Sequence, residues 1–229
     1  VDVSGAAQVG IPVIRLGFNN DLGWMTTVNP IDSMDLYELE LVGDGYRWNG
    51  AVAPFETEAV TLKVKQPDGS FTEDRTVVRR SVHGPVIVTR NNKAIALRMA
   101  GLDQPWMLDQ YWAMARSRNR KEFEAQLQRL QIPAYNVIYA DREGGILHLF
   151  NGRVPKRPPE NYPWEWVVPG TTSATLWTET HAYADLPKVV DPPSGWLQNA
   201  NDPPWLDTLP PVLDPAKFPG YMAPRFFQF

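Results

Sequence analysis

Apolar and polar residues alternate along much of the chain, which is the pattern of half-buried β-strands. The alternation is clearest on either side of two turn signals, Pro67-Asp68-Gly69 and Asn91-Asn92, and each predicts an antiparallel hairpin. The same pattern, or a short apolar run, predicts strands at residues 11–18, 35–42, 59–66, 72–82, 85–90, 93–99, 136–140 and 145–150. These strands favour antiparallel sheets.

At residues 106–117 and 119–130 the apolar residues no longer alternate but follow helical spacing, and we predict two helices there. Asn119 stands at the capping position of the second helix, and Glu122 follows three residues later as in a capping box. Hairpins combined with one helical pair near 106–130 predict an α+β fold of antiparallel β-hairpins with a helical layer.

Proline divides the chain unevenly, with 7 prolines in residues 1–154 and 15 in residues 155–229. Because proline cannot donate to a β-ladder, we expect a β-rich core over 1–154 and an irregular, Pro- and Trp-rich wrap over 155–229. The chain has 229 residues, starts close to a strand and ends in the aromatic stretch Phe226-Phe227-Gln228-Phe229. We therefore expect a fragment of a larger protein, or one chain of a processed one.

Composition excludes several function classes. A balance of 22 Lys+Arg against 26 Asp+Glu, net −4, argues against a nucleic-acid binder. The chain has no cysteine, which removes disulfides, thiolate metal sites and cysteine nucleophiles. No apolar run approaches the roughly 18 residues that span a bilayer, so we expect no membrane association. Motifs of serine hydrolases, zinc proteases, P-loops and dinucleotide sites are also missing from the sequence.

The isolated polar residues have two interpretations each. The three histidines, His83, His148 and His181, are scattered, and we predict structural roles for them. Asp32 and Asp35 lie close together in the sequence, either as a polar turn or as oxygen ligands for a hard cation such as calcium.

Two stretches are dense in Asn, Gly and Trp: residues 17–28 (GFNNDLGWMTTV) and 195–205 (GWLQNANDPPW). Buried asparagines must be hydrogen-bonded, so such stretches brace a loop or point an amide at a ligand. Arg15 also stands out, because it interrupts the apolar run 11–18, and a charge there must be paired or must face a cavity.

These stretches resemble the penicillin/cephalosporin acylase family of N-terminal-nucleophile hydrolases. Further segments follow in the order of that family over nearly the whole chain: SVHGPV (81–86), PAYNVIYADREGGI (133–146), VPKR (154–157), VPG (168–170), LWTETH (176–181) and QNANDPPW (198–205). The likeness is closest to the glutaryl-7-aminocephalosporanic acid acylases. It implies that the hairpins and helices form part of an αββα sandwich.

The resemblance implies a set of site residues. The backbone N–H of Val28 and the side-chain amide of Asn201 would form the oxyanion hole. Arg15 would hold a carboxylate on the acyl chain, with Tyr135 and Gln8 on the wall of the same pocket; an internal salt bridge is the alternative for Arg15. Arg15 facing a pocket would favour a carboxylated substrate, whereas an ion-paired Arg15 would favour an apolar one.

The nucleophile implied by the resemblance is an N-terminal serine that lies outside this chain, generated by autoproteolytic processing. The family's α chain and the first part of its β chain would be the partners, and the location would be the periplasm or outside the cell. Residues 29–35 are more similar to the penicillin G acylases, which implies a structural calcium bound by Asp32, Asp35 and the Met34 carbonyl; otherwise we expect no cofactor.

The sequence therefore predicts a linear-amide hydrolase that releases a carboxylic acid from an acylated amine such as a glutaryl or adipyl cephalosporin or β-lactam. The alternative in the same class is an acyl-homoserine-lactone acylase. A different class is a non-catalytic, Trp-rich module that binds carbohydrate or peptide, which coplanar exposed rings would favour: Trp24, Trp48, Trp106, Trp164, Trp166 or Trp196. Without its nucleophile, the isolated chain should be inactive.

Overall fold

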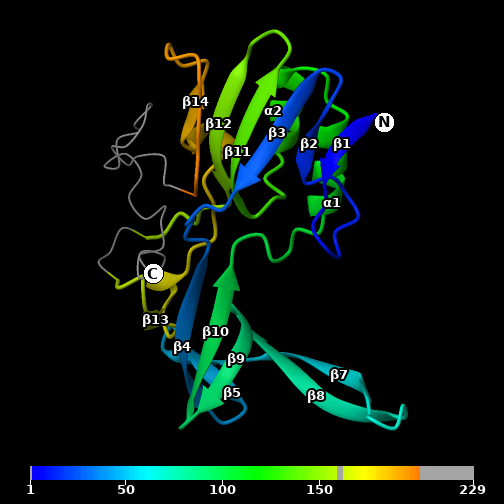
Figure 1. Cartoon of the computed structure of the whole chain (residues 1–229). Helices are drawn as coiled ribbons and strands as arrows, with labels where there is room; N and C mark the ends of the chain where they lie inside the picture. The colour runs from blue at the N-terminus through cyan, green and yellow to red at the C-terminus, as the bar shows by residue number, and fades with distance from the viewer. Residues whose placement is uncertain (1, 159–161, 202–229) are drawn as a thin grey trace. The chain divides into compact units, whose positions relative to one another are not determined.

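The computed structural model describes residues 2–158 and 162–201 (Figure 1). Two compact units are present. The described part of unit 1 comprises residues 2–33, 100–156 and 179–201, and that of unit 2 comprises residues 34–99, 157–158 and 162–178. This division differs from the predicted boundary at residue 154, because short strands from the Pro-rich part of the chain join both sheets.

Unit 1 contains a six-stranded sheet in the order β1-β2-β3-β11-β12-β14, with every neighbouring pair antiparallel. Its strands are β1 (Val3–Ala6), β2 (Leu16–Asn19), β3 (Leu22–Thr27), β11 (Ala134–Asp141), β12 (Ile146–Gly152) and β14 (Lys188–Val190). The predicted pair at 136–140 and 145–150 is confirmed as β11 and β12. Strand β11 thus lies beside β3, although the two are far apart in sequence, and it brings Asn136 opposite Thr27.

The predicted strand at 11–18 is wrong over most of its length, because β2 begins only at Leu16. Pro12 has no N–H to donate to a ladder. Residues before it turn instead: the Ile11 N–H donates to the Gln8 carbonyl at 2.9 Å, and Gly10 has φ +84°. Arg15 therefore lies in a loop rather than inside a strand.

The two predicted helices are confirmed with shorter ends, as α1 (Met107–Ala115) and α2 (Arg120–Leu127). Asn119 caps α2 as expected, since its Oδ1 accepts the Glu122 N–H at 2.9 Å. The Glu122 carboxylate accepts from the Arg118 N–H at 2.9 Å, one residue earlier than in a standard capping box. Within the described ranges, no helix is long and apolar enough to cross a membrane.

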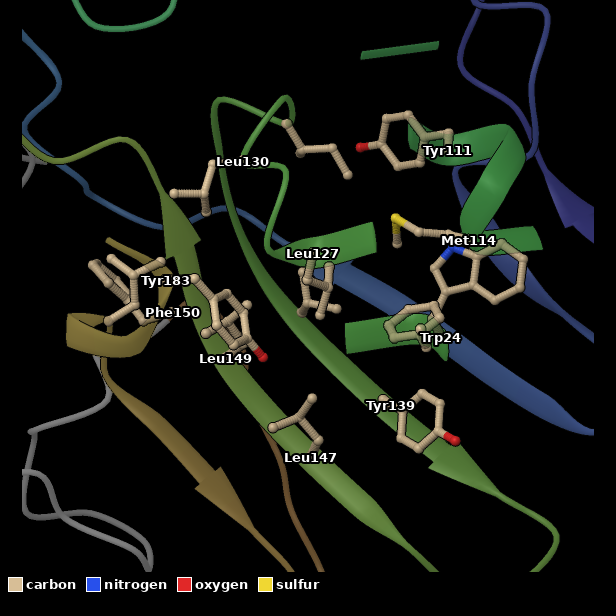
Figure 2. Packing of buried hydrophobic residues seen from close by; sticks show 14 of the residues in the cluster. Trp24, Tyr111, Met114, Leu127, Leu130, Tyr139, Leu147, Leu149, Phe150 and Tyr183 are labelled. Carbon is tan, nitrogen blue, oxygen red and sulfur yellow. The ribbon is translucent and has the colours of Figure 1, made fainter. Parts of the chain in front are cut away.

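The helices and the sheet of unit 1 share one hydrophobic core (Figure 2). Helix α2 contributes Phe123 and Leu127, which are fully buried, and the strands contribute Trp24, Tyr139 and Leu149. The rings of Phe123 and Tyr139 lie 4.9 Å apart in a tilted arrangement. Burial of these side chains is the main source of stability for the helices, which are too short to be stable alone.

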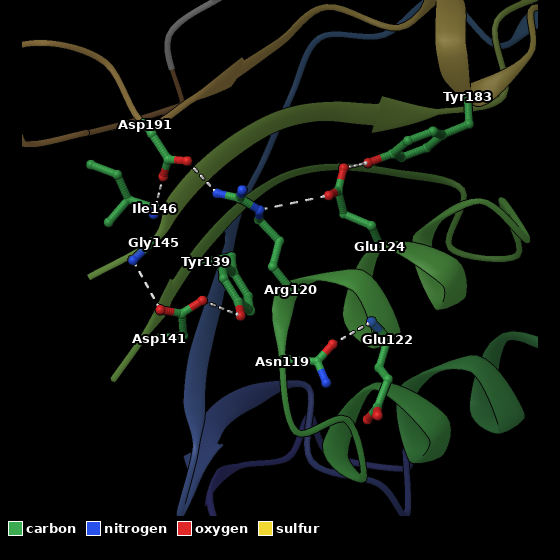
Figure 3. A network of polar contacts seen from close by, with 10 residues as sticks. All are labelled: Asn119, Arg120, Glu122, Glu124, Tyr139, Asp141, Gly145, Ile146, Tyr183 and Asp191. Carbon is green, nitrogen blue, oxygen red and sulfur yellow. Dashed lines mark hydrogen bonds and ion pairs between the residues drawn. The ribbon is translucent and has the colours of Figure 1, made fainter. Parts of the chain in front are cut away.

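A polar network fixes the start of α2 to the sheet (Figure 3). The Arg120 guanidinium pairs with Asp191, whose other carboxylate oxygen accepts the Ile146 N–H at 2.9 Å. Asp141 accepts the Tyr139 hydroxyl at 2.8 Å and organises the turn between β11 and β12. The helix, this turn and the end of β14 are therefore tied together at one end of the sheet.

Unit 2 contains the second sheet, in the order β6-β5-β4-β10-β9-β8-β7, with β13 parallel to β4. Its strands are β4 (Met34–Val42), β5 (Gly45–Trp48), β6 (Ala51–Pro54), β7 (Glu56–Lys65), β8 (Phe71–Ser81), β9 (Gly84–Arg90), β10 (Lys93–Met99) and β13 (Val167–Pro169). Both predicted hairpins are confirmed. Asn91 and Asn92 have φ of +50° and +59°, as a two-residue turn of type I′ requires.

Residues 155–201 contain little regular structure where they are described, in agreement with their proline content. Besides β13 and β14 they form two short 3₁₀ turns, Ser173–Thr175 and Tyr183–Asp185. The rest of the described segment is irregular.

Candidate functional site

The end of β3 brings the two predicted oxyanion-hole residues together. Val28 follows the last residue of β3, and its backbone N–H donates to Oδ1 of Asn201 at 2.9 Å. Val28 is half exposed, so this edge of the site faces outward. Asn201 has φ +72°, a left-handed conformation that asparagine tolerates better than most residues. Val28 N–H and the Asn201 amide are therefore in direct contact, although they are far apart in sequence.

The arrangement also shows what must change for an oxyanion to bind. The Val28 N–H is used by the Asn201 amide oxygen, whereas an oxyanion hole needs two N–H donors aimed at one external oxygen. An incoming oxygen would take the place of Asn201 Oδ1, and the amide would turn its Nδ2 toward it. This change is a rotation of the Asn201 side chain.

Asn199 connects the loop of Asn201 to β3. Its Oδ1 accepts three hydrogen bonds: from the Thr27 hydroxyl, from Asn136 Nδ2 at 3.1 Å and from the Asn201 N–H at 2.9 Å. One amide oxygen thus ties together the end of β3, the middle of the sheet and the residue that carries the second predicted donor.

Asn136 and His148 extend this connection into the core. Asn136 on β11 is fully buried, and its Nδ2 donates to the Val28 carbonyl as well as to Asn199, both at 3.1 Å. Its Oδ1 lies 3.2 Å from Nε2 of His148 on β12. Burial lowers the pKa of His148 to about 4, so its imidazole is neutral at physiological pH. Hydrogen bonds thus link His148, Asn136, Asn199 and Asn201 in one series.

Sequence analysis missed Asn136 and Asn199 as site residues and assigned His148 only a structural role. A signal for Asn136 existed, since it interrupts the apolar strand AYNVIYAD. A buried amide in such a strand must have partners, but the sequence does not say which ones.

The second predicted group, Arg15, Tyr135 and Gln8, is also brought together in unit 1. Nη1 of Arg15 donates to Gln8 Oε1 at 2.6 Å, and its guanidinium carbon lies 4.1 Å from the centre of the Tyr135 ring. The Arg15 carbonyl accepts the Trp24 indole N–H at 2.8 Å, which fixes the loop. Among the described residues, no carboxylate forms an ion pair with Arg15.

Tyr111 on α1 lies near this group and was not identified from the sequence. Its hydroxyl and Nε of Arg15 are both buried and have no hydrogen-bond partner in the described part of the chain. Burial raises the pKa of Tyr111 to about 12, against the opposing effect of the Arg15 guanidinium nearby. A tyrosine hydroxyl accepts as well as donates, so its oxygen can face the Arg15 guanidinium, and the hydroxyl proton remains available to an oxygen-bearing ligand.

The predicted calcium ligands fall into different units, Asp32 into unit 1 and Met34 and Asp35 into unit 2. Asp35 is fully buried, and its carboxylate accepts from Arg157 Nε at 3.1 Å and from the Trp177 indole N–H at 2.6 Å. The charge of Asp35 is thus balanced by a guanidinium, and its role as a calcium ligand stays a prediction. Across residues 2–158 and 162–201, no three acidic or histidine side chains are grouped to hold a metal.

His83 has the structural role predicted for it. It is buried in unit 2, its Nε2 lies 3.0 Å from the Gly170 carbonyl, and its ring stacks on Tyr37 at 4.0 Å. Burial lowers the pKa of His83 to about 4. His181 is partly buried, with Nδ1 3.7 Å from the Asp185 carboxylate.

The six tryptophans of the predicted set, all of them described, differ in burial. Trp24 is buried in the core of unit 1, and Trp48 and Trp164 are partly buried against the core of unit 2. The remaining three of the predicted set are exposed but lie on separate segments: Trp106 before α1, Trp166 before β13 and Trp196 after β14. This arrangement does not favour a carbohydrate-binding module.

Comparison with known proteins identifies relatives of this chain. The family model described as penicillin amidase matches residues 1–225. The acyl-homoserine lactone acylase PvdQ of Pseudomonas fluorescens (strain Pf0-1) is 32% identical over 233 residues, covering 90% of this chain and 30% of that protein. Penicillin acylase 2 proenzyme of Pseudomonas sp. (strain SE83) is 26% identical, over 99% of this chain and 29% of that protein.

A solved structure shares the fold. The thermostable penicillin G acylase from Alcaligenes faecalis superposes with a TM-score of 0.79 and 25% sequence identity, over 91% of this chain and 38% of that chain. The predicted α+β fold is thereby confirmed. The chain spans about a third of the length of the curated relatives it matches.

Proposed function

The chain belongs to the penicillin amidase family, and from this premise we propose that the complete protein is an acylase that hydrolyses linear amides. The observation that carries the proposal is the contact between the Val28 N–H and the Asn201 amide at the end of β3. Amide hydrolysis passes through a tetrahedral oxyanion that needs two N–H donors, and these two groups can supply them once the Asn201 amide turns its Nδ2 toward the oxyanion.

The proposed reaction uses a nucleophile outside residues 1–229. An N-terminal serine, activated by its own α-amino group, adds to the amide carbonyl and forms a C–O bond. The oxyanion replaces Asn201 Oδ1 as the acceptor of the Val28 N–H and also binds Asn201 Nδ2. Collapse breaks the C–N bond, the amine leaves with a proton, and water then hydrolyses the acyl-serine to release the acid.

This proposal includes partners and a location. The nucleophile and the rest of the acyl pocket would come from the remaining acylase segments, produced by autoproteolytic processing, and the mature enzyme would act in the periplasm or outside the cell. The support is the family membership and the fact that the relatives are about three times as long as this chain.

Arg15 indicates the acyl group. Its guanidinium is half-buried, forms no ion pair with a described carboxylate, and lies near the buried Tyr111 hydroxyl. A desolvated guanidinium needs a counter-charge, and a carboxylate at the end of a glutaryl or adipyl chain supplies one. We therefore take a carboxylated acyl amide, such as a glutaryl cephalosporin, as the substrate class.

Acyl-homoserine lactones are the second candidate, because several relatives carry the name acyl-homoserine lactone acylase. The fatty chain of such a substrate requires an apolar pocket. Arg15 would then have to be shielded by the Tyr135 ring and satisfied by Gln8 alone.

The test is hydrolysis by the complete protein of a glutaryl amide and of an acyl-homoserine lactone, with the acid or amine product quantified. Asn201→Ala should lower kcat about 10²–10³-fold, as loss of an oxyanion donor does elsewhere. Asn20→Ala, an exposed asparagine whose side chain contacts only the surface carboxylate of Asp2 among the described residues, is the matched control and should retain activity. Full activity of Asn201→Ala, or turnover by residues 1–229 alone, would refute the proposal.

A further inference from the structure

We infer that Asn136, oriented by His148, is a positioning residue for both oxyanion-hole donors. This inference rests on the proposed function, because it concerns how the donors at Val28 and Asn201 are held. It assigns a role to a buried histidine and a buried asparagine that the proposed reaction does not otherwise use.

Both N–H groups and the carbonyl oxygen of the Asn136 side-chain amide have hydrogen-bond partners. A primary amide has two N–H donors and one carbonyl oxygen. One proton of Nδ2 goes to the Val28 carbonyl and the other to Asn199 Oδ1. The oxygen is left to face His148 Nε2, 3.2 Å away. Since that oxygen can only accept, the imidazole must donate, and the proton of neutral His148 resides on Nε2.

Each of these hydrogen bonds acts on a different donor of the oxyanion hole. The bond to the Val28 carbonyl fixes the plane of the peptide group that follows Val28 and restrains the backbone beside its N–H. The bond to Asn199 fixes the oxygen that also accepts the Asn201 N–H, and so restrains the backbone of Asn201. One buried amide therefore sets the distance between the two donors.

His148 prevents the alternative orientation of that amide. If the Asn136 side chain turned by half a revolution, its Nδ2 would face the Nε2–H of His148, and its oxygen would face the Val28 carbonyl and Asn199 Oδ1. A donor would then face a donor, and an acceptor would face two acceptors, around a side chain that has no exposure to water itself. A buried network of this kind fixes one arrangement only when every member is satisfied.

Positioning of this kind has a kinetic consequence. A displacement of about 1 Å at a reacting centre can cost about 10²-fold in rate. Loss of the His148 donor should therefore reduce kcat, which depends on the oxyanion, far more than KM, which depends on the acyl pocket around Arg15.

The test compares variants of the complete protein on the amide substrate that it hydrolyses best. His148→Leu removes the donor and should lower kcat about tenfold to hundredfold with little change in KM. His148→Gln retains a side-chain N–H and should restore most of the loss. His83→Leu is the matched control: it removes an equally buried histidine from unit 2 and should leave kcat unchanged in the folded protein.

A second measurement does not depend on catalysis. Hydrogen exchange of the Val28 and Asn201 backbone amides, followed in the same complete protein, should accelerate in His148→Leu and in Asn136→Asp but not in His83→Leu. Melting temperatures are recorded for every variant, so that only folded proteins are compared.

The outcomes separate the two proposals. Unchanged kcat and unchanged exchange in folded His148→Leu, or an equal loss of kcat in His83→Leu, would overturn the positioning role. A wild-type protein that hydrolyses no amide would overturn the proposed function, and the exchange rates would still decide whether His148 holds the two donors in place.

Discussion

The guanidinium of Arg15 lies over the ring of Tyr135, with 4.1 Å between its central carbon and the ring centre. The ring covers one side of the cation, and its edge remains available to an anion. Arg15→Leu should therefore lower kcat/KM for a glutaryl amide by about tenfold to hundredfold, the value of a hydrogen bond to a charged group. For a matched amide with an uncharged acyl chain, kcat/KM should stay the same or rise.

Arg116→Leu is the control for that change. Arg116 is an exposed arginine of the same unit, immediately after α1. The ratio of kcat/KM for the two substrates should be unaffected by Arg116→Leu. If Arg15→Leu left the ratio unaffected as well, the substrate class would have to be sought among uncharged acyl chains, with acyl-homoserine lactones first.

Tyr135 should contribute through its ring rather than through its hydroxyl. Tyr135→Phe retains the face beneath Arg15, so kcat/KM for the glutaryl amide should change little. Tyr135→Leu removes the cation–π contact, which is worth about 1 kcal/mol, and should reduce kcat/KM several-fold. Steady-state kinetics of the two variants, side by side, measure the difference; an equal loss in both would assign the contribution to the hydroxyl.

Local turn chemistry made much of the fold predictable. The hairpin around Asn91-Asn92 was correct because both asparagines adopt the positive φ that the turn requires. The same reasoning could have found β5 and β6, which flank the Asn49-Gly50 turn. The strand predicted from the apolar run 11–18 was wrong over most of its length. Apolar content alone does not reveal that Pro12 and the turn before it prevent β-strand pairing.

Long-range pairing could not be predicted in this way. Strand β13 joins β4 and strand β14 joins β12, so the Pro-rich segment is shared between the two units, and three-residue strands carry almost no sequence signal. Val28 and Asn201 were found only through the family resemblance. Asn136, His148 and Tyr111 were not found, because a buried polar residue in a strand or helix shows that it needs a partner but not where that partner lies.

Asp35 and Arg157 form the most buried ion pair described in unit 2, with side-chain exposures of 0% and 8%. Arg157→Leu would leave a buried carboxylate without its cation, and we expect it to lower the free energy of unfolding by about 3–5 kcal/mol. Arg47→Leu, which breaks the exposed pair with Glu40 in the same unit, should change it by less than about 1 kcal/mol. Chemical denaturation of the two variants measures both values.

Chelation tests the alternative role of Asp35. Because Arg157 already balances its charge, EGTA should leave the melting temperature of the wild-type protein unchanged. A clear fall in melting temperature on chelation, reversed by calcium, would restore Asp32, Asp35 and the Met34 carbonyl as calcium ligands.

Acid should destabilise both units through their buried histidines. Burial lowers the pKa of His83 and of His148 from 6.5 to about 4 in the folded protein. Between these values the unfolded chain binds a proton that the folded chain does not, so stability falls as the pH drops from about 6.5 to about 4. Each histidine accounts for roughly 3 kcal/mol at the acid end of that range.

Urea denaturation at a series of pH values measures this loss. His148→Gln, which cannot be protonated in this range, should flatten the dependence of unfolding free energy on pH between about 6.5 and 4, and His83→Gln should do the same for its own unit. His181→Gln is the control, since that ring is only partly buried and its pKa is lowered less strongly. An unchanged slope in His148→Gln would mean that the folded protein accepts the proton, and with it that the Nε2–H of His148 is not held in a neutral, buried contact with Asn136.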